Sequence, residues 1–286
     1  MATELKQVKQ RLASTRQIAK VTRAMQNVAA TRLVRDRRAA ERITRYVDGL
    51  REVLGRLGAS VSHPAHPLLA ATGRGRAALV AFGSDRGLCG GFNSLLVDEV
   101  QRFVAGRGAD AVDVVVVGKV LARRLRRVGR RLHRFFPQPG RQPAAGGGDG
   151  LPALVGAVTD GFLAGTFREV HLLYFRFVTR LRQTAAIERL LPVPWPPAAP
   201  PAGRWYAFEP LPETILARVL PEFVGRSVEA ALLHSVASED AARQTAMSRA
   251  SENANGIIRG LMVAYRRLRQ ESITTEMIEI AGGGGG

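Results

Sequence analysis

The chain has 286 residues, of which 46% are apolar, enough for one domain with a hydrophobic core and an additional elongated element. Its formal charge of +18 comes almost entirely from arginine and predicts an acidic partner, although charge alone does not distinguish nucleic acid, phospholipid and protein. The sequence lacks an apolar run of about eighteen residues and an apolar signal core, so we expect a cytosolic chain, and the single Cys89 excludes an internal disulfide and a cysteine-based zinc site.

The first predicted element is a helix over residues 3–57, with Thr3 as its N-cap and Gly58 as its end. Apolar and small residues recur along it at spacings of three and four, which is a coiled-coil seam, with one extra three-residue step, a stammer. The seam residues are Leu5, Val8, Leu12, Thr15, Ile18, Thr22, Met25 and Ala29. The outer face is basic, which is also compatible with an ordinary solvated helix face.

From Ala77 onward, buried strand patterns alternate with helix patterns, which indicates an α/β domain. The predicted strands cover 77–82, 112–117, 131–136, 169–178 and 184–191, and the predicted helices cover 94–105, 121–128 and 151–164. The last two strands are too close for a crossover helix and predict a hairpin. We therefore expect a Rossmann-like, parallel sheet with an antiparallel edge.

A proline-rich linker over 192–201 precedes the C-terminal region. Pro212 is expected to begin a short helix that Pro221 terminates, after which one helix of roughly sixty residues runs to about Ile280. Its heptad seam comprises Met247, Ala250, Ala254, Ile257, Leu261, Ala264 and Leu268. Because neither terminal seam has another partner, we expect the fold class α/β: a long antiparallel coiled coil of the N- and C-terminal helices plus an α/β head, divided as residues 1–58, 76–192 and 210–280.

The glycine-rich stretch 84–93 lies between a strand and a helix, where α/β folds bind phosphate. It lacks the spacing of dinucleotide and P-loop motifs and has no nearby lysine, so we expect a tight turn packed under the sheet edge. Cys89 has no histidine in its loop to act as base, which favours a small buried residue over a nucleophile. The five histidines lack ligand spacing apart from His63 and His66, which fall in a proline-rich linker, so the sequence predicts no catalytic site, no cofactor and no metal.

Three stretches resemble the gamma subunits of F-type ATP synthases, the central rotor shafts of rotary enzymes. They are residues 21–30, residues 85–93, and the end of the C-terminal helix, where Ala241-Ala242-Arg243 and Ala246-Met247 precede residues 269–276. With the order of elements they cover essentially the whole chain. The chain departs from the family pattern where arginine replaces lysine around Met25, and where Ala19 replaces glutamine, which leaves the role intact and the subtype open.

The resemblance implies a central-stalk rotor subunit that couples ion flow through a membrane ring to ATP synthesis or hydrolysis, without being catalytic itself. The implied partners are the alpha and beta subunits of the catalytic hexamer, the epsilon subunit and the membrane c-ring, with one copy per complex at the cytoplasmic face of the bacterial inner membrane. The resemblance assigns contacts with the catalytic subunits to Arg23, Met25, Arg243, Gln270, Thr274 and Glu276, and foot contacts with the membrane ring to Tyr206 and Glu209.

Two other functions are compatible with parts of the sequence. A basic coiled-coil protein that binds nucleic acid explains the arginines but not the α/β head or the match over 272–274. An α/β enzyme that uses the stretch 84–93 leaves the long helices without a purpose. For the individual residues, the alternative is that Arg243, Gln270, Thr274 and Glu276 are ordinary solvated positions of a polar helix.

Overall fold

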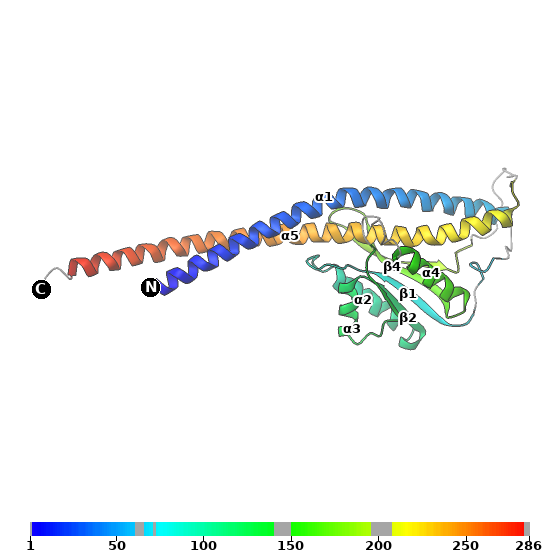
Figure 1. Ribbon diagram of the computed structural model, residues 1–286, viewed down its shortest axis with the longest axis horizontal. Helices are drawn as coiled ribbons and strands as arrows, with labels where there is room; N and C mark the ends of the chain where they lie inside the picture. The colour runs from blue at the N-terminus through cyan, green and yellow to red at the C-terminus, as the bar shows by residue number, and fades with distance from the viewer. Residues whose placement is uncertain (1, 61–65, 71–72, 140–149, 196–207, 283–286) are drawn as a thin grey trace. The chain divides into compact units, whose positions relative to one another are not determined.

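The computed structural model describes residues 2–60, 66–70, 73–139, 150–195 and 208–282. These residues form two compact units, which we call the terminal unit, residues 1–31 and 243–286, and the central unit, residues 32–242. Two long helices, α1 (Ala2–Ser60) and α5 (Pro212–Gly282), each contribute one part to each unit (Figure 1).

In the terminal unit, the first half of α1 and the second half of α5 lie side by side in antiparallel directions (Figure 1). The buried positions along this part of α1 are Leu12, Thr22 and Ala29, and those along α5 include Met247, Ser251 and Ala254. Their spacings are ten and seven on α1 and four and three on α5, as the seam of a helix pair requires. The predicted antiparallel pairing of the two chain ends is confirmed.

Two of the predicted seam residues are wrong. Ile18 is 56% exposed and Ile257 is 55% exposed, whereas Ala19 is half-buried and Ser251 is buried. With Ala19 in the seam, the extra three-residue step lies between Thr22 and Met25 and not between Thr15 and Ile18. The prediction preferred the larger apolar residue, but closely packed helices accept alanine and serine at the contact.

The central unit contains a five-stranded sheet in the order β3-β2-β1-β4-β5. Its strands are β1 (Arg76–Phe82), β2 (Val112–Val117), β3 (Arg134–Phe136), β4 (Phe167–Phe177) and β5 (Gln183–Leu191). The pairs around β1 and β2 are parallel, and β5 pairs with β4 antiparallel. The predicted Rossmann-like sheet with an antiparallel edge hairpin is therefore confirmed.

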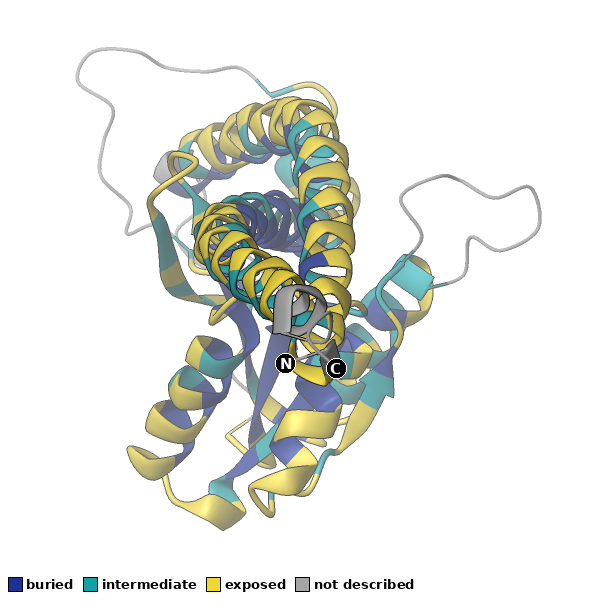
Figure 2. Cartoon of the chain, turned by 90° about the vertical axis from the view of Figure 1, so that its left-hand side faces the viewer, coloured by how far each residue is buried: buried dark blue, intermediate teal, exposed yellow. Residues whose placement is uncertain are grey.

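Helices cover both faces of this sheet. On one face lie α2 (Phe92–Ala105) and α3 (Lys119–Arg127), and on the other lie α4 (Gly150–Leu163) and the central-unit parts of α1 and α5. Each face of the sheet carries its own hydrophobic core, and strand β1 contributes to both. Leu79 packs in the core under α2 and α3, while Val80 and Phe82 pack in the core under α1, α4 and α5. A short 3₁₀ helix, η1 (Ala109–Ala111), precedes β2. Figure 2 shows the central strands buried and the outward sides of the helices exposed.

Both long helices pass the residues that were predicted to end them. Helix α1 continues through Gly58 to Ser60, because Leu57 is completely buried in the core. Helix α5 begins at Pro212 and includes Pro221, so the predicted break there is wrong. A proline inside a helix costs about 3 kcal/mol, and burial of the neighbouring Leu220 and Phe223 offsets this cost. None of the described helices is both long and apolar enough to cross a membrane.

Candidate functional site

The predicted contact residues of α1 lie in the terminal unit. Arg23 is exposed, and it lies one residue beyond the buried Thr22 on the outer side of the helix pair. Met25 is half-buried beside the seam. Because the two residues are two positions apart on a helix, they offer a charge and an adaptable apolar surface on different sides of α1.

The predicted contact residues of α5 differ in exposure. Gln270 and Thr274 are exposed, and the Thr274 hydroxyl donates to the Gln270 carbonyl oxygen at 2.9 Å, so the two residues share one helix face. Arg243 is only 7% exposed, so the alternative that all four positions are ordinary solvated ones is wrong for Arg243. Glu276 belongs to α5, but its side chain lies outside the described part of the chain.

The predicted foot is described at one of its two residues. Glu209 is exposed and lies three residues before the start of α5 at Pro212. Leu211, two residues after Glu209, is 71% exposed. Tyr206 lies outside the described residues. The described part of the foot therefore offers a carboxylate and an exposed leucine close together in the chain.

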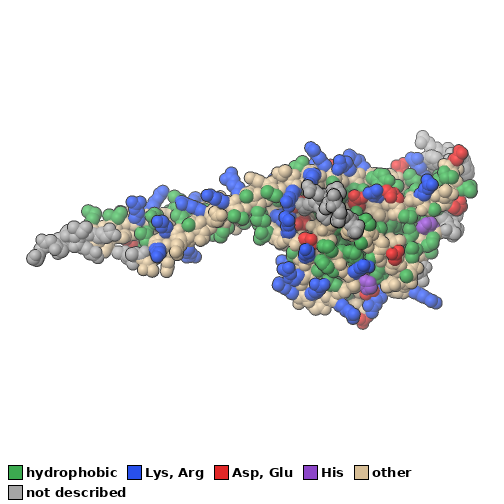
Figure 3. All heavy atoms as spheres, viewed as in Figure 1, with side chains coloured by type: hydrophobic (Ala, Val, Ile, Leu, Met, Phe, Trp, Pro, Cys, Tyr) green, Lys and Arg blue, Asp and Glu red, His purple; other side chains and the backbone are tan. Residues whose placement is uncertain are grey.

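The terminal unit is strongly basic. Its sequence contains twelve Lys and Arg residues against five Glu residues and no Asp. In Figure 3, Lys and Arg side chains are spread along the visible face of this unit. One of its few described acidic groups, Glu271, is already paired with Arg267 at 2.8 Å, and the Arg267 side chain is 81% exposed. The surface that remains is suited to an acidic partner.

The glycine-rich loop between β1 and α2 is held closed by Asn93. The Asn93 Oδ1 accepts from the Ser84 backbone N–H at 3.2 Å, and the Nδ2 donates to the Ser84 hydroxyl at 2.7 Å and to Cys89 Sγ at 3.3 Å. Asn93 and Cys89 are both 2% exposed, and Leu88, the residue before Cys89, has a left-handed φ of 62°. Because the buried polar groups of the loop serve one another, it forms the predicted tight turn rather than an open phosphate cradle.

Asp85 connects this loop with the neighbouring crossover. Its Oδ1 accepts from the backbone N–H of Lys119 at 2.8 Å, at the first residue of α3, and from that of Gln138 at 3.2 Å. A carboxylate at a helix N-terminus is stabilised by the free N–H groups and by the helix dipole. Asp85 thus caps the N-terminus of α3 and not that of α2, the helix that follows the loop.

Helix α5 is hydrogen-bonded to the carboxyl ends of two central strands. The Ser235 hydroxyl donates to the Phe82 carbonyl oxygen at 2.6 Å, and the Ser238 hydroxyl donates to the Phe175 carbonyl oxygen at 2.9 Å. Both serines are at most 1% exposed. The next residue, Glu239, accepts from Gln138 Nε2 at 3.1 Å. These contacts attach α5 to the sheet within the central unit.

The sequence prediction missed this attachment. Its signal is the polar run Ser235-Val236-Ala237-Ser238-Glu239-Asp240, in which every residue is at most 3% exposed. Small hydroxyl residues inside a long helix allow the ends of strands to approach the helix closely. The hydroxyl groups then donate hydrogen bonds to the carbonyl oxygens of those strands. Such a run marks a helix face that packs against backbone rather than against another helix.

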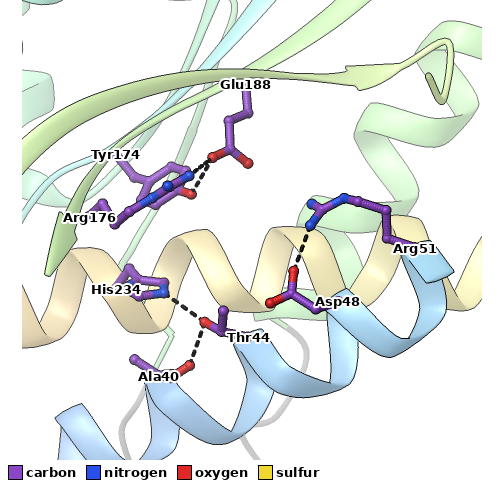
Figure 4. Close-up of polar contacts among 8 residues, drawn as sticks. All are labelled: Ala40, Thr44, Asp48, Arg51, Tyr174, Arg176, Glu188 and His234. Carbon is purple, nitrogen blue, oxygen red and sulfur yellow. Dashed lines mark hydrogen bonds and ion pairs between the residues drawn. The ribbon is translucent and has the colours of Figure 1, made fainter. Parts of the chain in front are cut away.

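A second polar link joins α1 to α5 in the central unit (Figure 4). The Thr44 hydroxyl donates to the Ala40 carbonyl oxygen at 2.7 Å and lies 2.8 Å from His234 Nε2. Since the hydroxyl proton is used on Ala40, the His234 Nε2–H is the donor to Thr44. Burial lowers the pKa of His234, and the charge of Arg176 lowers it further, so the ring is held neutral.

In the same region, three polar side chains on the edge hairpin β4–β5 interact with one another. The Tyr174 hydroxyl donates to Glu188 Oε1 at 2.9 Å, and Arg176 pairs with the same carboxylate. Burial, with the charge of Glu188, raises the pKa of Tyr174 to about 12. Within the described ranges, no three His, Cys, Asp or Glu side chains are grouped to hold a metal ion.

Three comparisons place the chain among known proteins. A family model described as ATP synthase matches residues 4–285. An ATP synthase gamma chain from Geotalea daltonii is 36% identical over 98% of this chain and 97% of its own length, and one from Heliobacterium modesticaldum is 34% identical over the same shares. A chain of the mitochondrial ATP synthase of Euglena gracilis has a TM-score of 0.70 at 17% identity, over 99% of this chain and 94% of that one, which shows a shared fold.

The family match covers the long helices, the sheet and the loop alike, so it does not rest on a single motif. The solved Euglena structure is likewise matched over nearly its whole length, as is a second one described as a rotor, with a TM-score of 0.63 at 16% identity over 96% of this chain and 100% of that one. The chain belongs to the family of ATP synthase gamma chains, the central-stalk rotor subunits of rotary ATP synthases.

Proposed function

We propose that this chain is a non-catalytic rotor that turns inside a hexamer of alpha and beta subunits and is driven by, or drives, a membrane c-ring. We further propose one copy per complex, an epsilon subunit bound beside it, and a position at the cytoplasmic face of a bacterial inner membrane. The observation that carries this proposal is the near full-length match to bacterial gamma chains. The titles of the similar Euglena structures name F1, a c-ring and a rotor.

The terminal unit is the part proposed to contact the catalytic subunits. Twelve basic residues against five acidic ones attract acidic loops over much of its surface. Exposed charge pairs contribute only about 0.2–1 kcal/mol each, so many of them hold a partner without a deep energy minimum at one angle. A rotor requires this property, because it must leave each contact as it turns.

The individual contacts are proposed on different grounds. Exposed Arg23, Gln270 and Thr274 are available to a surrounding ring, and Arg243 lies about 40 Å along α5 from Gln270 at ~1.5 Å per residue, thus at another level. Because Arg243 is buried, we assign it to fixing the helix that presents these contacts. Met25 and Glu276 complete the set through the family resemblance.

The central unit is proposed to transmit force to the membrane ring. The hydroxyl bonds of Ser235 and Ser238 fix α5 to the sheet, so that rotation of one carries the other. The foot residues Tyr206 and Glu209 are assigned to the c-ring contact by resemblance. The occupancy of the catalytic sites and the angle of the rotor then bias each other, as coupled equilibria must. A nucleic-acid-binding role is not favoured, because the family match accounts for the basic surface.

The test is ATP-driven ion pumping by a complex reconstituted with variants of this chain. Changing Gln270→Ala together with Thr274→Ala should lower pumping several-fold, as expected for losing contacts worth on the order of 1 kcal/mol together. Gln101→Ala, an exposed position on α2, is the matched control and should pump normally. Undiminished pumping by a correctly assembled complex with Arg23, Gln270 and Thr274 all changed to alanine would refute these contacts.

A further inference from the structure

A cavity of about 280 Å³ lies in the central unit between α1, α5 and the β4–β5 hairpin. Its wall is largely apolar and comes from all three elements and the segment after β5. The apolar lining residues are Leu54, Leu172, Leu190, Pro194 and Phe223. Concave, mostly apolar pockets of about this size with a few polar groups are typical of small-molecule sites.

Two hydrogen-bond donors in the lining have no partner among the residues that the structure describes. The Trp195 Nε1 and the Ser227 Oγ are buried atoms, and neither has a hydrogen bond within the described chain. Buried polar groups are nearly always satisfied, because leaving one unpaired costs free energy. The indole N–H can only donate, so the missing partner carries an acceptor.

One positively charged side chain of the cavity lining has no ion pair within the described residues. Arg51 is paired with Asp48 at 2.6 Å, and Glu188 is held by Tyr174 and Arg176 (Figure 4). Arg189, next to Glu188 on β5, also lines the cavity and has no ion pair within the described ranges. The net charge at the cavity is therefore positive.

We propose that this cavity binds a small organic acid. Its apolar body packs against Leu172 and Phe223, and its carboxylate accepts hydrogen bonds from the Trp195 indole and the Ser227 hydroxyl, with Arg189 as the charge partner. A carboxylate supplies the acceptors that these donors lack and the negative charge that Arg189 lacks. Because the site joins two helices and a hairpin, binding stabilises the central unit in proportion to ligand occupancy.

The site can be tested through its own tryptophan. The chain has two tryptophans, so Trp205→Phe in the full chain leaves Trp195 as the single emitter. Titration with octanoate should change its emission saturably and raise the melting temperature. Ser227→Ala and Arg189→Gln should each weaken octanoate binding about tenfold, as expected for loss of a hydrogen bond to a charged group.

Two matched controls separate the proposed site from nonspecific binding. Arg182→Gln, an exposed arginine on the same hairpin that does not line the cavity, should bind octanoate like the parent. Octanol, which has the same chain without the charge, should bind at least about tenfold more weakly than octanoate to the parent and equally to parent and Arg189→Gln. No saturable change in a folded parent, equal binding of octanol and octanoate, or unchanged binding in both Ser227→Ala and Arg189→Gln would overturn the proposal.

Discussion

Asn93 illustrates how one buried side chain decides what a glycine-rich loop does. Its amide holds the Ser84 backbone, the Ser84 hydroxyl and Cys89, while Asp85 in the same loop caps the N-terminus of α3. The sequence predicted a tight turn with a buried Cys89, because motif spacing and missing bases are visible in the chain itself. It did not predict which residue closes the turn, since that depends on hydrogen bonds between Ser84 and Asn93, which are nine residues apart in the sequence.

Other residues were out of reach of pattern analysis. The burial of Arg243 was not predicted, because an arginine on a polar helix is usually solvated. Ile18 and Ile257 were placed in the seam by their apolar character, although helix geometry turns them outward. In both cases the identity of the residue suggested one environment and the position on the helix determined another.

His234 gives a pH dependence of stability. Burial lowers its pKa in the folded chain below the ordinary value of 6.5, so the unfolded state binds more protons between these two pKa values. Its contribution to stability is therefore fully present above pH 6.5 and is lost as the pH falls from there toward the folded-state pKa. We expect chemical denaturation of the full chain to show lower stability at pH 5 than at pH 7.

The variant His234→Gln isolates this contribution. A glutamine amide can still donate to Thr44 but does not titrate. The loss of stability between pH 7 and pH 5 should be smaller in His234→Gln than in the parent. An identical loss in both chains would show that His234 does not cause it.

At the scale of elements, the attachment of α5 to the sheet is the feature with the clearest consequence. Changing Ser235→Ala and Ser238→Ala removes two buried hydrogen bonds to the Phe82 and Phe175 carbonyl oxygens. We expect the free energy of unfolding to fall by about 1 kcal/mol for each. In the complex, this variant should hydrolyse ATP at a nearly normal rate but pump fewer ions per ATP, because rotation of α5 is transmitted less firmly.

A serine elsewhere on α5 provides the control. The Ser248 hydroxyl donates to Glu252 on the same helix at 3.0 Å and makes no hydrogen bond to a strand within the described residues, so Ser248→Ala should leave both stability and the pumping ratio unchanged. An equal drop in hydrolysis and pumping in the double variant, with an unchanged ratio, would mean that the two serines only stabilise the fold.

The elements themselves were largely predictable, whereas their ends were not. Continuous apolar runs and seams are local patterns, and they located the five described strands and the three α-helices of the sheet domain but not the short helix η1. The passage of α5 through Pro221 depends on buried neighbours such as Leu220 and Phe223, which outweigh the local signal. The hydroxyl bonds from α5 join residues 153 and 63 positions apart, so no local pattern contains them.

On the scale of the whole molecule, the pairing of the chain ends followed from two seams that had no other partner, and the structure and the family agree with it. The three-part division into residues 1–58, 76–192 and 210–280 stays a prediction. Contacts in the structure instead group residues 32–242 around the sheet, because the middle parts of α1 and α5 share its core. A seam in the sequence cannot show where the two helices stop packing only on each other and begin to pack on the sheet as well.

Rotation of single complexes tests the central claim most directly. The chain's one cysteine, Cys89, is buried, so Arg123→Cys on the exposed side of α3 gives a unique attachment point for a visible probe. With the catalytic hexamer fixed to a surface through its alpha and beta subunits, added ATP should make the probe turn in one direction, in steps, and turning should stop when ATP hydrolysis is inhibited. A hexamer that binds this chain and hydrolyses ATP at full rate while the probe does not turn would contradict its role as the rotor.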